Sequence, residues 1–358
     1  MIASFSALRF INALMIFCHH KNSIDNPYLV AFGPCAVSFF LMLSGFVMCC
    51  GYKEKVIAPE FCYKKFLLKR FARLYPLHLL CLVLWLGLNI KSLVSWGGVQ
   101  IFSVICNLFL VQSWIPKSSV YFSGNSVSWC LSDLFFFYAV FPFVIKLIQN
   151  KKRMVAFTTI YFGLYSLICA FVPKDYIHAF IYINPLFRFA DFFIGILLYT
   201  LYKKESGLEK RKLFGTCLQI ISLLVVCFAI YIYQFVPESL HFQALFFIPS
   251  ALIVMSYAIF NKTLVTMLLD NRYFFYLGEI SFTFYMLHTL GIAFVNIVVS
   301  HLGLELAFVN IVVSHLGLEL AFVYKSLLEF LFVLVGSVIV HRFYEKILAK
   351  KLLMLFDM

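Results

Sequence analysis

The chain of 358 residues is 63% hydrophobic and only 13% charged, with a mean hydropathy of +0.95. These values exclude a water-soluble globular protein, whose surface needs more polar residues. They predict an all-α, polytopic integral membrane protein that forms one domain over residues 1–358. The net charge of +13 does not indicate nucleic-acid binding, because the basic residues occur in short clusters between apolar segments.

Eleven cysteines are scattered along the chain without a Cys-x-x-Cys pair. This spacing favours buried free thiols over a disulfide framework or a zinc site. No metal is therefore expected.

Ten apolar segments have the length that crosses about 30 Å of hydrocarbon. A further apolar segment, 101–114, is shorter and contains Asn107 and Gln112, which predicts a re-entrant or interfacial segment instead of a crossing. The ten predicted spans are 4–20, 30–50, 75–91, 129–147, 154–172, 186–202, 213–235, 243–260, 274–299 and 321–341.

The distribution of Lys and Arg predicts the orientation of these spans. Alternate loops hold 22 of the 29 basic residues, and the opposite loops hold very few. By the positive-inside rule the basic loops and both termini are cytoplasmic. The basic loops are 51–75, 146–153, 203–212, 261–273 and 342–351.

The stretch "AFVNIVVSHLGLEL" occurs at 293–306 and again, letter for letter, at 307–320. A single identical pair indicates an in-frame duplication and not a repeat architecture. Each copy is about 21 Å long as a helix and is too short to cross alone. We expect the extra residues to lengthen the outer connection between the last two spans, with His301, Glu305, His315 and Glu319 as solvated loop residues.

The first span, "ALRFINALMIFCHH", carries Arg9 near its inner end and two histidines at its outer end. Eleven residues at 100° each leave Arg9 and His20 about 20° apart around the helix, whereas His19 is about 80° away. An arginine on a span costs at least about 2.5–3.5 kcal/mol. The shared face therefore predicts that Arg9 and His20 line a polar cavity; the alternative is snorkelling at both interfaces.

The stretch "YKKFLLKRFARLYP", 63–76, predicts a basic amphipathic helix in the inner loop after the second span. Anionic lipid headgroups are one partner for such a helix. Arg70 and Arg73 are three residues apart and so share a face. They could instead bind the phosphates of a soluble cytoplasmic ligand.

Asp133, in "SVSWCLSDLFFFYAVFP", is expected in the outer third of its span, at a depth similar to that of His20. A carboxylate there is unfavourable unless it is paired, hydrogen-bonded or hydrated. Pairing with His20 would fix the tautomer of the imidazole and raise its basicity. The alternative is that Asp133 only caps its own helix.

Two further polar sites are weaker signals. Arg188 and Asp191 are spaced i, i+3 and can neutralise one another. His288 is expected near the bilayer centre, where a neutral packing histidine is the favoured interpretation.

Several of these stretches, in this order along the chain, together resemble the membrane-bound acyltransferase-3 family, the polytopic O-acyltransferases of surface polysaccharides. The family pattern usually has Glu where this chain has Asp133. The matching stretches are "LRFINALMIFCHH", "AVSFFLMLSGFVM", "LKRFARLYP", "SVSWCLSDLFFFYAVFP", "FRFADFFIGILLY" and "LGEISFTFYMLHT".

The resemblance implies transfer of an acyl group, most simply acetyl, from acyl-CoA to a sugar hydroxyl of a surface glycan or its lipid-linked precursor. His20 would act as general base or as acyl carrier, Asp133 would orient it, and Arg9 would stabilise the bound donor. Arg70 and Arg73 would bind the CoA. The implied setting is the inner (cytoplasmic) membrane, with membrane lipids, acyl-CoA and a glycan acceptor as partners.

Two other functions use the same residues differently. A flippase or transporter for a lipid-linked glycan would line its path with Arg, His and Asp without any chemistry. A sensor of acyl-CoA or lipid would need Arg70 and Arg73 but not His20.

Overall fold

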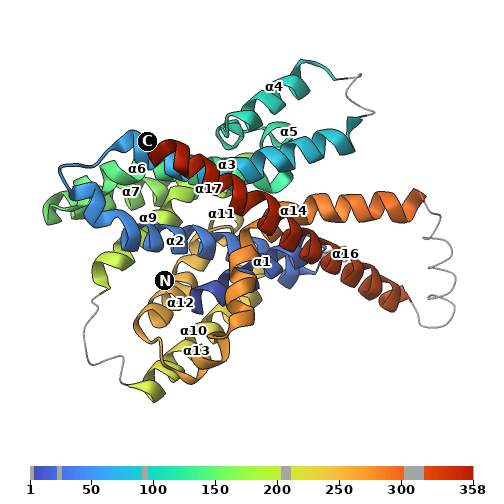
Figure 1. The fold of residues 1–358 in the computed structure, drawn as a ribbon. Helices are drawn as coiled ribbons and strands as arrows, with labels where there is room; N and C mark the ends of the chain where they lie inside the picture. Colours follow the sequence, from blue (N-terminus) through green and yellow to red (C-terminus); the bar gives the residue numbers. More distant parts are fainter. Residues whose placement is uncertain (1–3, 22–25, 91–95, 203–210, 302–317, 358) are drawn as a thin grey trace.

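The computed structural model describes residues 4–21, 26–90, 96–202, 211–301 and 318–357, and every regular element in these ranges is a helix (Figure 1). The α-helices are α1 (Ser4–His20), α2 (Pro27–Ile57), α3 (Tyr63–Leu88), α4 (Gly98–Leu108), α5 (Ser118–Tyr121), α6 (Trp129–Ile148), α7 (Lys151–Phe171), α8 (Lys174–Ile177), α9 (Pro185–Leu201), α10 (Lys212–Ile232), α11 (Glu238–His241), α12 (Phe247–Ile259), α13 (Leu264–Leu269), α14 (Arg272–His301), α16 (Leu318–Val340) and α17 (Lys346–Asp357). Single turns of 3-10 helix are η2 (Gln112–Trp114), η3 (Ser126–Ser128), η6 (Tyr233–Phe235) and η7 (Ala244–Phe246), and π-helical turns are η4 (His178–Ile183) and η8 (His341–Glu345).

The predicted all-α, polytopic membrane protein is confirmed. Within the described ranges, seven helices are long and apolar enough to cross a membrane, or eight if the bent pair Lys174–Ile183 and Pro185–Leu201 counts as one span. Helices also occupy the other two predicted ranges. However, α1 has 17 residues, and Ala244–Ile259 is similarly short.

The predicted basic helix of the inner loop is the first half of α3 and not a separate element. A single helix runs over Tyr63–Leu88, with Pro76 inside it. Proline has no backbone N–H for the helical hydrogen bond, but here the helix continues through it. The carbonyl of Pro76 accepts a hydrogen bond from the Tyr344 hydroxyl, at 3.0 Å.

The predicted non-crossing segment 101–114 forms α4 and η2, which are separated by a turn with Leu110 at φ 54°. Asn107 and Gln112 are both fully buried. The Ser128 hydroxyl donates to Asn107 Oδ1, and the Gln112 amide donates to the Ser128 carbonyl, both at 3.1 Å. The polar residues that argued against a crossing therefore fasten this segment to the start of α6.

Glycines allow two pairs of helices to touch backbone to backbone. A Cβ added at Gly45 of α2 would lie 2.0 Å from the Phe192 carbonyl oxygen of α9, and one at Gly195 would lie 2.0 Å from the Met42 carbonyl oxygen of α2. A Cβ at Gly278 of α14 would lie 2.4 Å from Ser6 of α1. Small residues are the usual means of close helix packing in membranes. These contacts bring α2 against α9 and α1 against α14.

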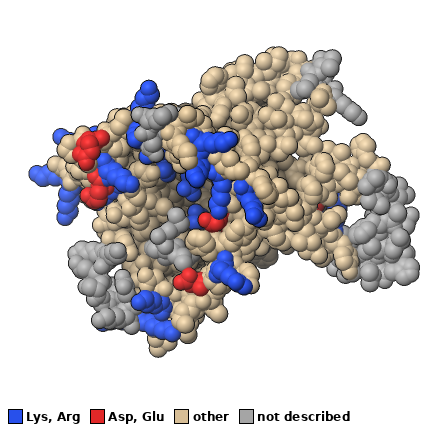
Figure 2. Space-filling model, in the orientation of Figure 1, with Lys and Arg blue, Asp and Glu red and all other residues tan. Residues whose placement is uncertain are grey.

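Basic residues gather over one end of the molecule (Figure 2). In the view of Figure 1, Lys and Arg cover the left half, where α2 turns back into α3 and where the chain ends after α17. The described surface at the right, which includes the ends of α14 and α16, shows very few basic side chains. This asymmetry agrees with the loop census from the sequence.

The duplicated 14-residue stretch lies largely outside the described residues. The first copy enters the structure only as far as His301, which ends α14. The prediction that Glu319 is a loop residue is wrong, because its backbone lies in the first turn of α16 (Leu318–Val340). The expectation of a lengthened outer loop carrying Glu305 and His315 falls outside the described part of the chain.

The contact between α2 and α9 leads to a stability prediction. Gly45→Ala forces its new methyl group into a backbone carbonyl, so the helices must separate at a cost of about 1–3 kcal/mol. We expect the midpoint of thermal unfolding in detergent to fall. Gly163→Ala on α7 is the matched control, because nothing lies within 4 Å of its added Cβ. An equal effect of the two substitutions would contradict the proposed helix contact.

Candidate active site

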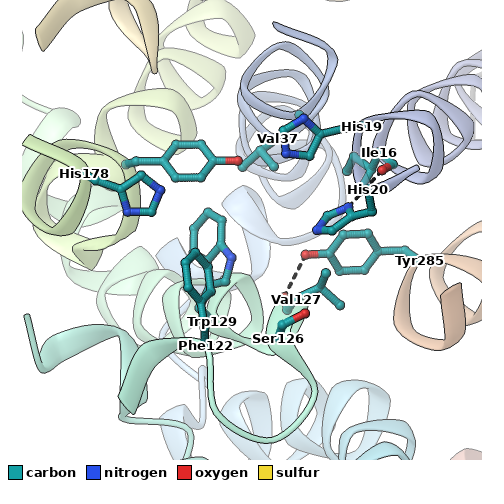
Figure 3. A pocket seen from close by; sticks show the side chains of 12 residues that line it. Ile16, His19, His20, Val37, Phe122, Ser126, Val127, Trp129, His178 and Tyr285 are labelled. Carbon is teal, nitrogen blue, oxygen red and sulfur yellow. Dashed lines mark hydrogen bonds between the residues drawn. The ribbon is translucent and has the colours of Figure 1, made fainter. Parts of the chain in front are cut away.

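A pocket of about 330 Å³ lies between the outer end of α1 and the helices around it (Figure 3). His20 and His178 lie on opposite sides of this pocket, with aromatic rings between them. The lining residues are Ile16, His19, His20, Gly33, Val37, Phe122, Ser126, Val127, Trp129, His178, Tyr182 and Tyr285.

His20 is the last residue of α1 and is exposed to the pocket. Its Nδ1 atom lies 2.9 Å from the Ile16 carbonyl oxygen, one turn back on the same helix. The same Nδ1 lies 3.2 Å from Nε2 of His288, a fully buried residue of α14. The structure therefore brings together two histidines that the sequence presented as separate features.

His19 faces a different neighbour. Its ring packs against the backbone of Gly33 in α2, where an added Cβ would lie 2.9 Å from the ring. Its Nδ1 contacts the Leu29 carbonyl oxygen at 3.2 Å. His19 therefore holds α1 against α2 and touches the pocket from the side.

The wall opposite His20 is aromatic. Trp129 and Tyr182 pack with their ring centroids 5.1 Å apart. His178 Nδ1 lies 3.2 Å from the Tyr121 hydroxyl. Burial raises the pKa of Tyr121, which lies in α5 outside the spans, so its hydroxyl stays protonated and can donate to His178. A flat ligand or the apolar face of a ring can pack against this wall.

Three hydrogen bonds fasten the middle of α14 to the segment before α6. The Tyr285 hydroxyl donates to the Val127 carbonyl at 2.8 Å, and the Asn125 amide donates to the Met286 carbonyl at 2.7 Å. The Thr289 hydroxyl donates to Asn125 Oδ1 at 2.8 Å. These bonds flank His288 and hold this part of α14 against the segment before α6.

The expected pairing of His20 with Asp133 is absent from the described structure. Asp133 is fully buried, and neither of its carboxylate oxygens has a hydrogen-bond partner among the described residues. Trp129, one helical turn before Asp133, occupies the pocket wall in its place. The sequence predicted the depth of Asp133 in the membrane, but it did not predict the direction in which the Asp133 side chain points from α6.

The expected neutralisation of Arg188 by Asp191 is confirmed. Both side chains are fully buried, and Nη1 lies 3.3 Å from Oδ2. The Gln243 amide donates to the same Oδ2 at 2.9 Å. The Arg188 guanidinium also lies 5.5 Å from the centre of the Tyr182 ring, which ties this ion pair to the pocket wall.

The predicted cations lie toward the other end of the bundle. Arg9 is half-buried, and its nearby charges are Arg73 of α3 and Glu279 of α14. Glu279 and His288 both belong to α14, so Arg9 and His20 lie toward the same neighbouring helix. Arg9 is not among the residues that line the pocket around His20. Arg73 is exposed. Arg70 stacks on the Tyr52 ring at 4.5 Å and hydrogen-bonds the Tyr52 hydroxyl.

Glu329 was not identified from the sequence. This fully buried carboxylate of α16 forms an ion pair with Lys21, the residue after His20, at 2.5 Å. A single acidic residue in the long apolar segment 321–341 was the only signal that could have indicated it. The ion pair fixes the end of α1 to α16.

The fold and this site define a polytopic helical membrane protein with one histidine exposed in a pocket between its helices and a second, buried histidine in contact with it. Comparison with known proteins assigns the class of chemistry: the profile described as "Acyltransferase domain" matches residues 2–341, and the chain belongs to this acyltransferase-3 family. It is therefore an acyltransferase.

Two relatives agree with this assignment. "Acyltransferase MdmB" of Streptomyces mycarofaciens is 27% identical over 321 residues, which cover 82% of this chain and 79% of the relative. ORF330 of Acidianus two-tailed virus, whose name marks it as a proposed acetyltransferase, is 26% identical over 68% of this chain and 70% of its own length. No solved structure matches the chain.

The buried ion pair at the end of α1 leads to a second stability prediction. Glu329→Gln leaves the Lys21 ammonium beside a neutral amide in a site where Lys21 is only 14% exposed. Removing one partner of a buried pair costs about 3–5 kcal/mol. We expect a marked fall in the midpoint of thermal unfolding.

Lys346→Gln is the control, because it removes only an exposed ion pair with Glu279, at 3.4 Å, and leaves the Glu279 charge near Arg9 in place. An exposed pair contributes about 1 kcal/mol or less. If Lys346→Gln destabilised the protein as much as Glu329→Gln, the ion pair of Lys21 and Glu329 would not anchor the end of α1 to α16.

Proposed function

We propose that the protein transfers an acyl group, most simply acetyl, from acyl-CoA to a sugar hydroxyl of a surface glycan or its lipid-linked precursor. His20 is the general base on the acceptor hydroxyl or, in the covalent variant, the residue that carries the acyl group. The observation that carries the proposal is the exposure of His20 in a pocket of an acyltransferase-3 chain. Trapping of radiolabelled acyl-enzyme without acceptor separates the two mechanisms.

The two ends of the bundle suit the two substrates. Exposed Arg73, with Arg70 one turn before it, offers cationic groups for the CoA phosphates at the end where Lys and Arg gather. Arg9 lies between these residues and the pocket, about 16 Å along α1 from His20. A long, narrow pantetheine arm matches that separation, with the thioester directed to His20 and the acceptor against the aromatic wall.

The proposed setting is the inner (cytoplasmic) membrane, with both termini cytoplasmic and membrane lipids around the helices. The concentration of basic side chains at one end supports this orientation by the positive-inside rule. The pocket then opens toward the outer side, where a glycan acceptor is found.

The role of His20 gives the first functional prediction. His20→Ala removes the proposed base or acyl carrier, and we expect acyl transfer to fall by about 10²–10⁴-fold. His19→Ala should have a milder effect, because His19 packs between α1 and α2. The readout is thiol release from acetyl-CoA by proteoliposomes supplied with envelope glycans of the host cell, with mass spectrometry of the glycans.

Membrane levels of each variant are measured in the same preparations. Equal losses from His19→Ala and His20→Ala, or full activity of His20→Ala, would contradict the assignment of His20.

The donor site gives the second functional prediction. Arg70→Ala and Arg73→Ala each remove a cation from the proposed phosphate site, and we expect a higher KM for acetyl-CoA with little change in kcat. Lys64→Ala, an exposed cation on the first turn of the same helix, is the control. Unchanged KM in both arginine variants would remove the donor role from this end of α3.

A further inference from the structure

The contact between His20 and His288 raises the question of which ring nitrogen carries each proton. The two ring centroids lie 4.8 Å apart with their planes at 65°. Nδ1 of His20 and Nε2 of His288 face one another at 3.2 Å. Two protonated nitrogens would repel, and two unprotonated ones would leave no hydrogen bond. One nitrogen must donate and the other must accept.

The surroundings of His288 determine its tautomer. Its Nδ1 lies 2.6 Å from the Tyr285 carbonyl oxygen, which can only accept a hydrogen bond, so Nδ1 carries a hydrogen. The ring is fully buried, and no carboxylate contacts it among the described residues. Burial without a counter-charge favours the neutral ring. Nε2 of His288 is then the unprotonated nitrogen and acts as the acceptor.

The tautomer of His20 follows from the same argument. Its Nδ1 faces two acceptors, Nε2 of His288 at 3.2 Å and the Ile16 carbonyl oxygen at 2.9 Å. Nδ1 therefore carries the hydrogen of the neutral ring, and the lone pair is on Nε2. Nε2 makes neither of these contacts, and the ring is exposed to the pocket.

We propose that His288 is a positioning residue that holds His20 in its Nδ1–H tautomer, with the Nε2 lone pair free to act on the acceptor hydroxyl. This inference rests on the proposed function and gives His288 the role that the sequence suggested for Asp133. Unlike a carboxylate, a neutral imidazole orients its neighbour without adding a buried charge.

This geometry supports acyl transfer in which Nε2 of His20 is the base. Nε2 of His20 takes the hydroxyl proton while the hydroxyl oxygen bonds to the thioester carbon. His20 is then an imidazolium, whose Nδ1–H stays bonded to His288 Nε2 and the Ile16 carbonyl. When the carbon–sulfur bond breaks, the CoA thiolate takes the proton from Nε2, and neutral His20 returns with an ester and a free thiol as products.

The first arm of the test reads the tautomer without requiring activity. Protein labelled with ¹⁵N-histidine is placed in lipid, and the ring nitrogens of His20 are assigned by comparison with His20→Ala. We expect a protonated Nδ1 and an unprotonated Nε2 in the natural chain. His288→Leu should raise the population of the opposite tautomer, and His288→Gln should preserve the natural pattern, because its amide oxygen can accept at the position of Nε2.

The second arm measures acyl transfer from acetyl-CoA with the glycan assay described above. His288→Leu should lower kcat by about 10–10²-fold, a part of the 10²–10⁴ that general-base catalysis contributes, with KM for acetyl-CoA within about twofold. His288→Gln should recover most of kcat. His78→Leu is the control, because His78 is another buried histidine whose Nε2 contacts a carbonyl, that of Asn107 at 2.8 Å.

The two arms distinguish failure of this inference from failure of the proposed function. A protonated Nε2 on His20, or an unchanged tautomer in His288→Leu, overturns the inference whatever the activity. An inactive His20→Ala together with unchanged kcat in both His288 variants also overturns it, while the role of His20 stands. Full activity of His20→Ala removes the proposed function itself, and with it the role of His288 in catalysis.

Discussion

The contact between α1 and α14 is the constraint on which the site depends. Gly278 lets the two backbones touch at Ser6, and fourteen residues further along α1 the ring of His20 meets His288. Both helices therefore run in the same direction, so Arg9 and His20 face one neighbour. A side chain at 278 would separate the helices. The close approach of α1 and α14 at Gly278 thus helps to bring His20 and His288 into contact.

The stretches that carried the family resemblance pack against one another in pairs. "LRFINALMIFCHH" lies on "LGEISFTFYMLHT", and "AVSFFLMLSGFVM" crosses "FRFADFFIGILLY" at Gly45 and Gly195. The second pair positions α9, whose buried Arg188 and Asp191 stand behind the pocket wall. The motif residues thus include helix contacts that shape the pocket and His20, which lines it.

Much of the fold could be predicted from local patterns. Apolar length indicated the helices, the i, i+3 spacing indicated the ion pair of Arg188 and Asp191, and the 100° rotation per residue separated His20 from His19. Asn107 and Gln112 correctly marked a segment unlike the spans, and both form hydrogen bonds with Ser128. Each of these inferences uses neighbours in sequence.

The rest depended on contacts between distant helices. The depth of Asp133 suggested a partner for His20, but Trp129 of the same helix lies in the pocket wall instead. The residue that contacts His20 is His288, 268 residues further along the chain. Glu329 and Lys21 are likewise far apart in the chain. The faces at which two helices meet depend on tertiary packing and not on neighbours in sequence.

The most direct test of this account is an experimental density map of the protein in lipid nanodiscs with an unreactive thioether analogue of acetyl-CoA. The account predicts the phosphates beside Arg70 and Arg73, the acyl end at His20, and the His20 ring against His288. A map with His20 directed into lipid, or with the acyl end remote from it, would contradict the central claim.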